Sequence, residues 1–377
     1  MFLAFPFPAG AQRKPPGKKL VSPQPSLAHP TITQFLPTWK RELEHDEDKT
    51  FLLHGLEFGF PLVDVETSTI SNTRCSNHKS TQQFKSKVSK RLMEEIKEGN
   101  YIETDPNTVK LISPLAAIEK SDGDVRLIHD LSYPANKSLN DFASKEYCEY
   151  ENIADAIDCL KPGMWMAKCD LKWAYRSVPI KPEHYPLTGL QWTFHGQGSP
   201  TTLFDTALPF GARKSPAHFN RVTKSIKRMM NRRNFNCIVY LDDFLLFEET
   251  LEKCKLALLT LIQLLRSLGF RINWKKVCDP CQCLVFLGIE IDLQTCTLQL
   301  DPIKRSELIK YIDTLTRRKR ISKHTLQVLG GKCTWASYVI RYARAHMNTI
   351  FHSMRYEARP QNVCGTLSPG GSAIVAK

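Results

Sequence analysis

Residues 237–247, CIVYLDDFLLF, carry two adjacent carboxylates, Asp242 and Asp243, between two apolar runs. Short apolar runs on either side of a polar step predict two buried strands joined by a tight turn, with the acids at its tip. Asp is also a common turn residue, so a plain polar turn explains this stretch taken alone. A further acid, Asp170, ends the apolar run WMAKCD 72 residues earlier.

Carboxylates at strand ends suit phosphoryl-transfer chemistry. Mg²⁺ prefers rigidly held oxygen ligands and lets substrate phosphates complete its octahedral shell. Two such ions about 3.5–4 Å apart can activate an attacking hydroxyl and neutralise a leaving group. Asp170, Asp242 and Asp243 therefore indicate a candidate two-metal site, if the fold brings the two strand ends together.

The composition favours a polyanionic partner. The chain has 52 Lys and Arg against 38 Asp and Glu, a formal charge of +14, which suits nucleic acid or an anionic membrane. The longest clearly apolar stretch, residues 256–265, is about half of what a bilayer requires, and the N-terminus lacks the basic region of a signal peptide. We therefore expect no membrane partner and an intracellular protein, in the cytoplasm or nucleus, that is not secreted.

Twelve cysteines are too sparse and too irregular in 377 residues for a disulfide framework, so reduced thiols are expected. The tightest group is Cys278, Cys281 and Cys283. It lacks the remaining ligand of a zinc site, so metal binding there is the less favoured interpretation.

The elements that position the acids follow from periodicity and turn signals. A helix over residues 215–234 should have Ser215 as N-cap and Pro216 as its first residue. Its apolar stripe is Phe219, Val222, Ile226 and Met230, and its basic stripe, interpreted as a solvated face, is Arg221, Lys224, Arg228 and Arg232. The other expected elements are a polar linker (66–83), a basic helix ended by Gly99, a hairpin turning at Asp122–Gly123 within 109–132, a helix over 152–163, a strand ending at Asp170, a helix over 250–268, strands over 284–300 and basic helices over 302–355.

Five motifs stand in the order seen in retroelement reverse transcriptases, which the chain resembles over residues 35–355: RLIHDLS (126–132), CDLKWAY (169–175), LPFGARKSPAHF (208–219), YLDD (240–243) and FLGIEI (286–291). Together they favour the catalytic interpretation of the acids over the plain turn. The flanking segments FLLHGLEFGFPL and LQVLGGKCTWASYVIRYARAHMNTIF look most like those of tyrosine-recombinase (DIRS-like) retrotransposons.

The resemblance implies an α+β fold of the right-hand fingers–palm–thumb polymerase kind, with an antiparallel palm sheet packed on helices. The expected divisions are a disordered basic, Pro-rich arm (1–37), an N-terminal extension (38–84), fingers and palm (85–300), a helical thumb (301–357) and a disordered tail (358–377). The implied activity is RNA-directed DNA polymerisation, a nucleotidyl transfer from dNTPs to a primer 3′-hydroxyl on an RNA/DNA template-primer.

The resemblance also assigns the catalytic residues. Asp170, Asp242 and the backbone carbonyl of Leu171 would hold two Mg²⁺ ions, with Mn²⁺ as a substitute. Asp243 matches the third family carboxylate, with the alternative that it tunes the field at the hairpin tip. Lys276 matches the lysine that protonates pyrophosphate, although its neighbour Lys275 competes for that assignment.

Nucleotide-binding and primer-binding residues are implied in the same way. Lys120 and Arg126 would clamp the triphosphate, unless they belong to a solvated strand face. Tyr175 would exclude a 2′-hydroxyl, unless it is ordinary palm packing, and Phe210 and Gly211 would shape the pocket floor. Leu171 would contribute to the nucleotide site through its backbone. The primer grip would be Phe286, Leu287 and Gly288.

Two alternatives to an active polymerase remain open. The chain could be a catalytically inactive, nucleic-acid-binding relic of the fold, or an unrelated two-metal nuclease, which would not need LPFG or an aromatic residue after Asp170. No acidic cluster of ribonuclease H type follows residue 313, so the sequence is expected to be the polymerase portion of a larger polyprotein or a truncated gene copy. The oligomeric state is left open.

Overall fold

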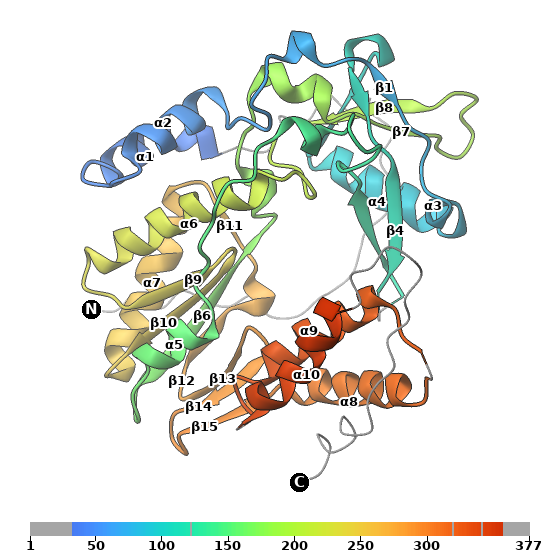
Figure 1. Ribbon diagram of the computed structural model, residues 1–377. Helices are drawn as coiled ribbons and strands as arrows, with labels where there is room; N and C mark the ends of the chain where they lie inside the picture. The colour runs from blue at the N-terminus through green and yellow to red at the C-terminus, as the bar shows by residue number, and fades with distance from the viewer. Residues whose placement is uncertain (1–31, 121–122, 319, 341, 357–377) are drawn as a thin grey trace, which may run out of the picture.

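The computed structural model describes residues 32–120, 123–318, 320–340 and 342–356 (Figure 1). Three groups of elements lie around the middle of the molecule: a palm sheet with its helices, fingers built on smaller sheets, and a helical thumb. This arrangement has the mixed helical and antiparallel architecture that the sequence predicts. Among the described residues, no helix is both long and apolar enough to cross a bilayer.

The palm is an antiparallel sheet in the order β11-β6-β10-β9, with β12 also paired to β6. Strand β10 is buried on both faces, because a different apolar cluster covers each of them. Phe244 and Leu246 face α6 and α7, whereas Leu245 and Phe247 face α5 and the sheet beyond. The bounds are β6 Trp165–Lys172, β9 Cys237–Tyr240, β10 Asp243–Glu248, β11 Arg271–Ile272, β12 Cys278–Cys281, α5 Ile153–Cys159, α6 Ser215–Asn231 and α7 Leu251–Ser267. The predicted strand end at Asp170 is too early, since β6 continues to Lys172.

Helix α6 buries its predicted apolar stripe completely. Its N-cap is Lys214, and Ser215 is already helical, so the predicted N-cap is wrong by one residue. The predicted solvated face is also wrong for most of the basic stripe, because its arginines pair with two acids from a distant part of the chain. These acids, Asp46 and Asp48, bind the side chains of Arg221, Arg228 and Arg232.

The two acids lie between α1 (Leu36–Glu42) and α2 (Lys49–Phe58), which pack against the palm helices. Trp39 of α1 is fully buried, and its indole N–H donates to the Leu268 carbonyl at 3.0 Å. Ile32, in the 3-10 helix η1 (Ile32–Phe35), is also fully buried. The predicted N-terminal arm therefore extends six residues too far, and its residues 1–31 lie outside the described residues.

The fingers contain the hairpin β4-β5 and the sheet β2-β8-β7 around a small apolar core. The predicted first strand of the hairpin is split, because β3 pairs with β1 instead. The predicted linker 66–83 therefore contributes to the fold; Ser80 Oγ accepts a hydrogen bond from the Ala117 N–H at 3.1 Å. Of the predicted turn, residue 122 lies outside the described residues and Gly123 has a φ of 77°. The bounds are β1 Thr73–Arg74, α3 Ser80–Gln83, α4 Lys85–Lys97, β2 Tyr101–Thr104, β3 Leu111–Ile112, β4 Leu115–Glu119, β5 Val125–His129, β7 Leu190–Trp192 and β8 Thr201–Asp205.

A three-stranded sheet, β13-β14-β15, leads from the palm into the thumb helices, as the strand and helix predictions for residues 284–355 indicate. The thumb contacts this sheet through Trp335, whose indole N–H donates to the Leu287 carbonyl at 3.0 Å. The predicted tail, 358–377, lies outside the described residues. The bounds are β13 Cys283–Phe286, β14 Ile289–Asp292, β15 Thr297–Leu300, α8 Pro302–Thr316, α9 Lys323–Ala336 and α10 Ala343–Tyr356.

Candidate active site

The three acids of the predicted metal site lie at one end of the palm sheet. Asp243 of β10 and Asp170 of β6 are cross-strand partners, and the Leu171 N–H donates to the Asp242 carbonyl at 3.2 Å. A two-residue turn, Leu241–Asp242, joins β9 to β10, and Leu241 takes a φ of 53°. Acids that are distant in sequence therefore form one carboxylate cluster, in which Asp170 is buried and the other two are partly exposed.

Two side chains that follow β11 hold the Asp170 carboxylate. Asn273 Nδ2 donates to Oδ1 at 2.8 Å, and Lys276 Nζ donates to Oδ2 at 2.8 Å. Lys275 and Lys276 are both exposed, and the side chain that contacts the cluster is that of Lys276. Asn273 was not among the residues predicted from the sequence. A usable signal was its spacing, because residues three apart in a 3-10 turn lie on the same side, and η7 (Trp274–Lys276) follows Asn273 directly.

The cluster concentrates negative charge. Burial raises the pKa of Asp242 above its usual value, and the neighbouring Asp170 carboxylate adds to that effect. Burial and the contact with Asp170 raise the pKa of Asp243 to about 6. Burial alone would lower the pKa of Lys276, but its hydrogen bond and attraction to Asp170 outweigh burial and raise it. The ammonium groups of Lys276 and Lys168 face three carboxylates, so the excess of acids favours additional cations.

The available donors fit Mg²⁺ or Mn²⁺. Carboxylate oxygens and the Leu171 carbonyl are hard ligands of the kind that these ions prefer. Within the described ranges, no group of three or more His, Cys, Asp or Glu side chains is arranged to hold a metal ion by itself. Mg²⁺ usually keeps several waters and takes substrate phosphates as ligands, so an open donor set is compatible with it. The metal ligands therefore stay a prediction.

Four of the predicted nucleotide-binding residues line one cavity of about 540 Å³: Lys120, Arg126, Phe210 and Gly211. Gly211 has a φ of 101°, and a Cβ there would lie 2.6 Å from the His129 carbonyl oxygen. A larger residue would therefore strain the wall of the cavity. The sequence analysis did not single out several other lining residues, among them Arg91, Glu95, Tyr101, His129 and Arg176.

Tyr175 connects this cavity to the acids. It follows β6 in the 3-10 helix η5 (Tyr175–Ser177), and its ring stacks on Phe210 with centroids 5.0 Å apart. It also meets Phe219 of α6 edge to face at 4.9 Å. The ring is therefore both part of the palm packing and a neighbour of the pocket floor. The Leu171 side chain is buried in the palm core, which leaves its backbone as the part that could serve the site.

The predicted primer grip divides into two kinds of residue. Leu287 and Gly288 form the turn between β13 and β14, with φ values of 48° and 82°. Phe286, in contrast, is fully buried among apolar side chains beneath the palm. Phe286 ends β13 and packs in the core, whereas Leu287 and Gly288 belong to the turn that follows the strand. Phe286 is therefore a core residue, and the assignment of these three residues to a primer grip stays a prediction.

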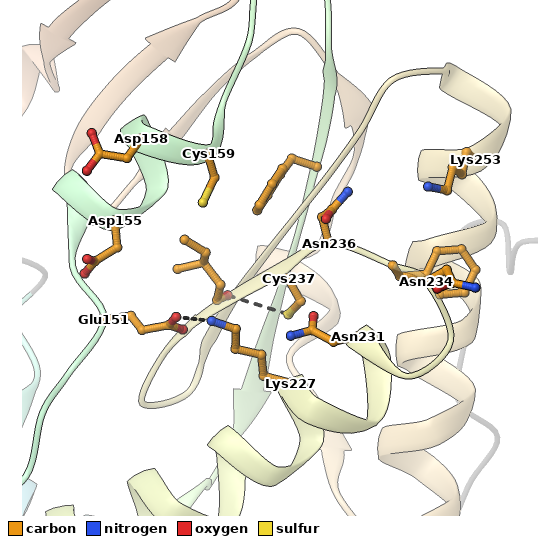
Figure 2. Close-up of a pocket in the computed structure, with 13 residues that line it drawn as sticks. Glu151, Asp155, Asp158, Cys159, Lys227, Asn231, Asn234, Asn236, Cys237 and Lys253 are labelled. Atoms are coloured by element: carbon orange, nitrogen blue, oxygen red, sulfur yellow. Dashed lines mark hydrogen bonds and ion pairs between the residues drawn. The ribbon is translucent and has the colours of Figure 1, made fainter.

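A cavity of about 590 Å³ lies elsewhere, along the edge strand β9, and Figure 2 shows its lining. Several of its charged residues already have partners: Glu151 pairs with Lys227 and accepts from the Val239 N–H at 2.8 Å. Lys253 pairs with Glu248 at 2.7 Å. None of the predicted site residues lines this cavity, so size alone does not identify the functional site.

A known protein family matches the segment that contains the candidate active site. Residues 118–291 match the family described as reverse transcriptase (RNA-dependent DNA polymerase), and this segment contains Asp170, Asp242, Asp243 and the residues that line the 540 Å³ cavity except those before 118. The match covers less than half of the chain, so the similarity to this family holds for that segment alone.

The proteins that this chain resembles in sequence include viral polyproteins. The Gag-Pol polyprotein of Avian reticuloendotheliosis virus is 26% identical over 185 residues, which are 48% of this chain and 16% of the polyprotein. That of Gibbon ape leukemia virus is 29% identical over 168 residues, 44% of this chain and 10% of the polyprotein. The chain thus spans a small part of the length of these relatives.

Solved structures extend the similarity of fold beyond the matched segment. The foamy viral protease-reverse transcriptase in complex with double-stranded DNA superimposes with a TM-score of 0.64 at 17% identity, covering 93% of this chain and 60% of that one. The same enzyme in complex with an RNA/DNA hybrid gives a TM-score of 0.62 at 17% identity, covering 96% and 46%. The predicted fingers–palm–thumb fold is confirmed.

Proposed function

We propose that this protein is an RNA-directed DNA polymerase that extends a primer 3′-hydroxyl with dNTPs. The single observation that carries the proposal is the meeting of Asp170, Asp242 and Asp243 at one end of the palm sheet. Tyr175 and Phe210 link that cluster to a cavity lined by basic side chains. We also propose an origin in a tyrosine-recombinase (DIRS-like) retrotransposon, which rests on the flanking sequence motifs.

In the reaction, the primer 3′-oxygen bonds to the α-phosphorus, the bond from that phosphorus to the bridging oxygen breaks, and pyrophosphate leaves. Bound Mg²⁺, held by Asp170, Asp242, Asp243 and the Leu171 carbonyl, would supply charge neutralisation and activation of the hydroxyl. Asn273 donates a hydrogen bond to Oδ1 of Asp170 and so holds this carboxylate in place. Lys276, beside the same carboxylate, donates a proton to the departing pyrophosphate as a general acid.

The cavity side chains bind the nucleotide. Lys120 and Arg126 offer a point charge and a planar fork, both suited to phosphate oxygens. Phe210 is 56% exposed and presents a flat face toward the same cavity. The surplus of positive charge, +14 over the chain, attracts the RNA/DNA template-primer, whose phosphates provide most of the binding energy.

The test is Mg²⁺-dependent dNTP incorporation by the full chain on a primed RNA template, with Asp170→Asn as the matched inactive control. We expect extension by the wild-type protein and none by the variant. Replacing Mg²⁺ with Mn²⁺ should support extension, and chelation should stop it. Tight binding of the primed template without any extension would overturn the proposal in favour of an inactive, nucleic-acid-binding relic.

A further inference from the structure

Behind the nucleotide cavity lies a buried polar cluster that the sequence did not predict. Its centre is the ion pair between Arg176 and Asp205, whose side chains are 6% and 0% exposed. Glu95 Oε2 lies 4.0 Å from Arg176 Nε, and His129 Nδ1 lies 3.5 Å from Asp205 Oδ2. The guanidinium also covers the Tyr101 ring at 4.8 Å from its centroid. Three side chains from separate elements thus gather around Arg176, with His129 joined to it through Asp205.

The cluster joins the palm to the fingers. Arg176 belongs to η5, immediately after the palm strand β6 that carries Asp170. Its partners belong to the fingers: Glu95 to α4, Tyr101 to β2, and Asp205 to β8. A side chain from the palm is therefore inserted into a buried part of the fingers.

Arg176 also contacts the floor of the nucleotide cavity. Its guanidinium lies 5.9 Å from the centroid of the Phe210 ring, and Tyr175, the preceding residue, stacks on the same ring. Because Phe210 is more than half exposed, few groups fix its orientation. The consecutive residues Tyr175 and Arg176 thus both contact one aromatic side chain, Phe210, in the substrate pocket.

The cluster is not fully satisfied as a purely structural network would be. Arg176 Nε, Asp205 Oδ2 and His129 Nδ1 are buried and have no hydrogen-bond partner among the described residues. Their nearest charged partners lie at 3.5 and 4.0 Å. A buried polar group without a hydrogen bond costs stability, and such groups in native proteins often mark a functional constraint. Arg176 and His129 both line the cavity, so these polar atoms without hydrogen bonds lie beside the proposed nucleotide site.

We propose that Arg176 is a positioning residue that sets the orientation of Phe210 and thereby the fit of the incoming nucleotide. The inference rests on the proposed polymerase function and adds a residue to it. Arg176 acts through Phe210 and through its anchor Asp205 in the fingers. Its effect should therefore fall on nucleotide KM and on sugar discrimination, with the carboxylate chemistry left intact.

The experiment separates positioning from stability. Arg176→Met or Asp205→Leu alone leaves an unpaired buried charge and should lower Tm by several degrees. The double variant R176M/D205L replaces the pair with apolar side chains and should recover Tm, because such replacements are often neutral or stabilising. It should still show a dNTP KM raised by at least ~10-fold, since the floor residue has lost its support.

Arg176→Lys provides a second, conservative variant. It keeps a charge for Asp205 but lacks the planar fork, so we expect most of the Tm to be retained and the KM defect to persist. The matched control is the pair Arg228–Asp46, another Arg–Asp bridge with a buried acid, on the outer side of α6. R228M/D46L should leave the dNTP KM unchanged.

Recovery of both Tm and KM in R176M/D205L would show that Arg176 is structural and would overturn the inference. A failure of wild-type extension would count against the proposed function instead. In that case equilibrium dialysis with labelled dATP gives the separate answer: equal affinity in the wild type and R176M/D205L overturns the positioning role, and at least ~10-fold weaker binding by the double variant supports it.

Discussion

Asp243 lies directly opposite Asp170 across the palm sheet, one on each of two neighbouring antiparallel strands. A slip of one residue in this register would turn one acid to the other face of the sheet. The two-residue turn at Leu241–Asp242 and the pairing of β10 with both β9 and β6 fix this register. The hairpin and the central place of β10 in the sheet thus determine where the carboxylates meet.

Loss of one acid should therefore remove activity and leave the fold. We expect Asp170→Asn or Asp242→Asn to reduce dNTP incorporation by ~10³-fold or more, because metal-borne charge stabilisation is worth several kcal/mol in the transition state. Template affinity and Tm should change little. The control is Asp158→Asn, at an exposed acid of α5. Near-wild-type incorporation by both variants would reject the metal assignment.

The ring of Tyr175 should discriminate between sugars. Tyr175→Ala is expected to lower the ratio of dNTP to rNTP kcat/KM by at least ~10-fold, because a steric barrier to the 2′-hydroxyl is removed. Its contacts with Phe210 and Phe219 also predict some loss of Tm. Tyr175→Phe retains the ring and serves as the control. An unchanged sugar ratio in the Ala variant, with equal losses for both substrates, would leave packing as the role of this residue.

Lys276 and Lys275 offer a direct comparison between neighbouring lysines. Lys276→Met should lower kcat by roughly 10²-fold, the usual contribution of a general acid, with little effect on dNTP KM. Lys275→Met should have little effect on either parameter, because the lysine that binds Asp170 is Lys276. Pre-steady-state incorporation isolates the chemical step. Equal losses in the two variants would contradict the assignment.

Template binding should weaken steeply with salt. Lys and Arg side chains that contact phosphates release counterions, so affinity should fall by orders of magnitude between roughly 50 and 200 mM salt. Fluorescence anisotropy with a labelled primed template measures this slope. An affinity that stays flat over that range would argue against nucleic acid as the partner of this basic chain.

Asp64 should make folding sensitive to acid. Partial burial alone would raise its pKa, but hydrogen bonds from Lys214 and from Ser144 lower it to about 2, below its ordinary value of 3.8. The resulting stabilisation is present above pH 3.8 and is lost as pH falls through about 2. Asp64→Asn should thus lower Tm at pH 6 and match the wild type near pH 2. A constant difference in Tm at both pH values would disprove this linkage.

Local patterns predicted much of this architecture. The β9-β10 hairpin, helices α4, α6 and α7 and the thumb helices follow from apolar spacing and from stop signals such as Gly99 and Gly269, whose φ values are 73° and 91°. Lys276 also lies beside Asp170, in the neighbourhood that its motif indicates. These features depend on residues close in sequence, where periodicity and turn chemistry act directly.

Most of the features that were not predicted from the sequence depend on contacts between residues far apart in the chain. The partners of Arg228 lie about 180 residues away, at Asp46 and Asp48, so its helix face looked solvated. Arg176 and Asp205 meet only when the fingers pack on the palm. The burial of Phe286 depends on which face of β13 meets the core, and a short motif does not specify that face.

The packing of α1 and α2 on the palm has a practical consequence for anyone preparing fragments of this protein. A polypeptide trimmed to the family match, beginning at residue 118, would lose Trp39 and the acids at positions 46 and 48. Leucine side chains of its palm helices would then be exposed to water, and three arginines would lose their carboxylate partners. Such a product should aggregate or bind non-specifically to polyanions, so a well-behaved fragment must include Ile32 and the helices that follow it.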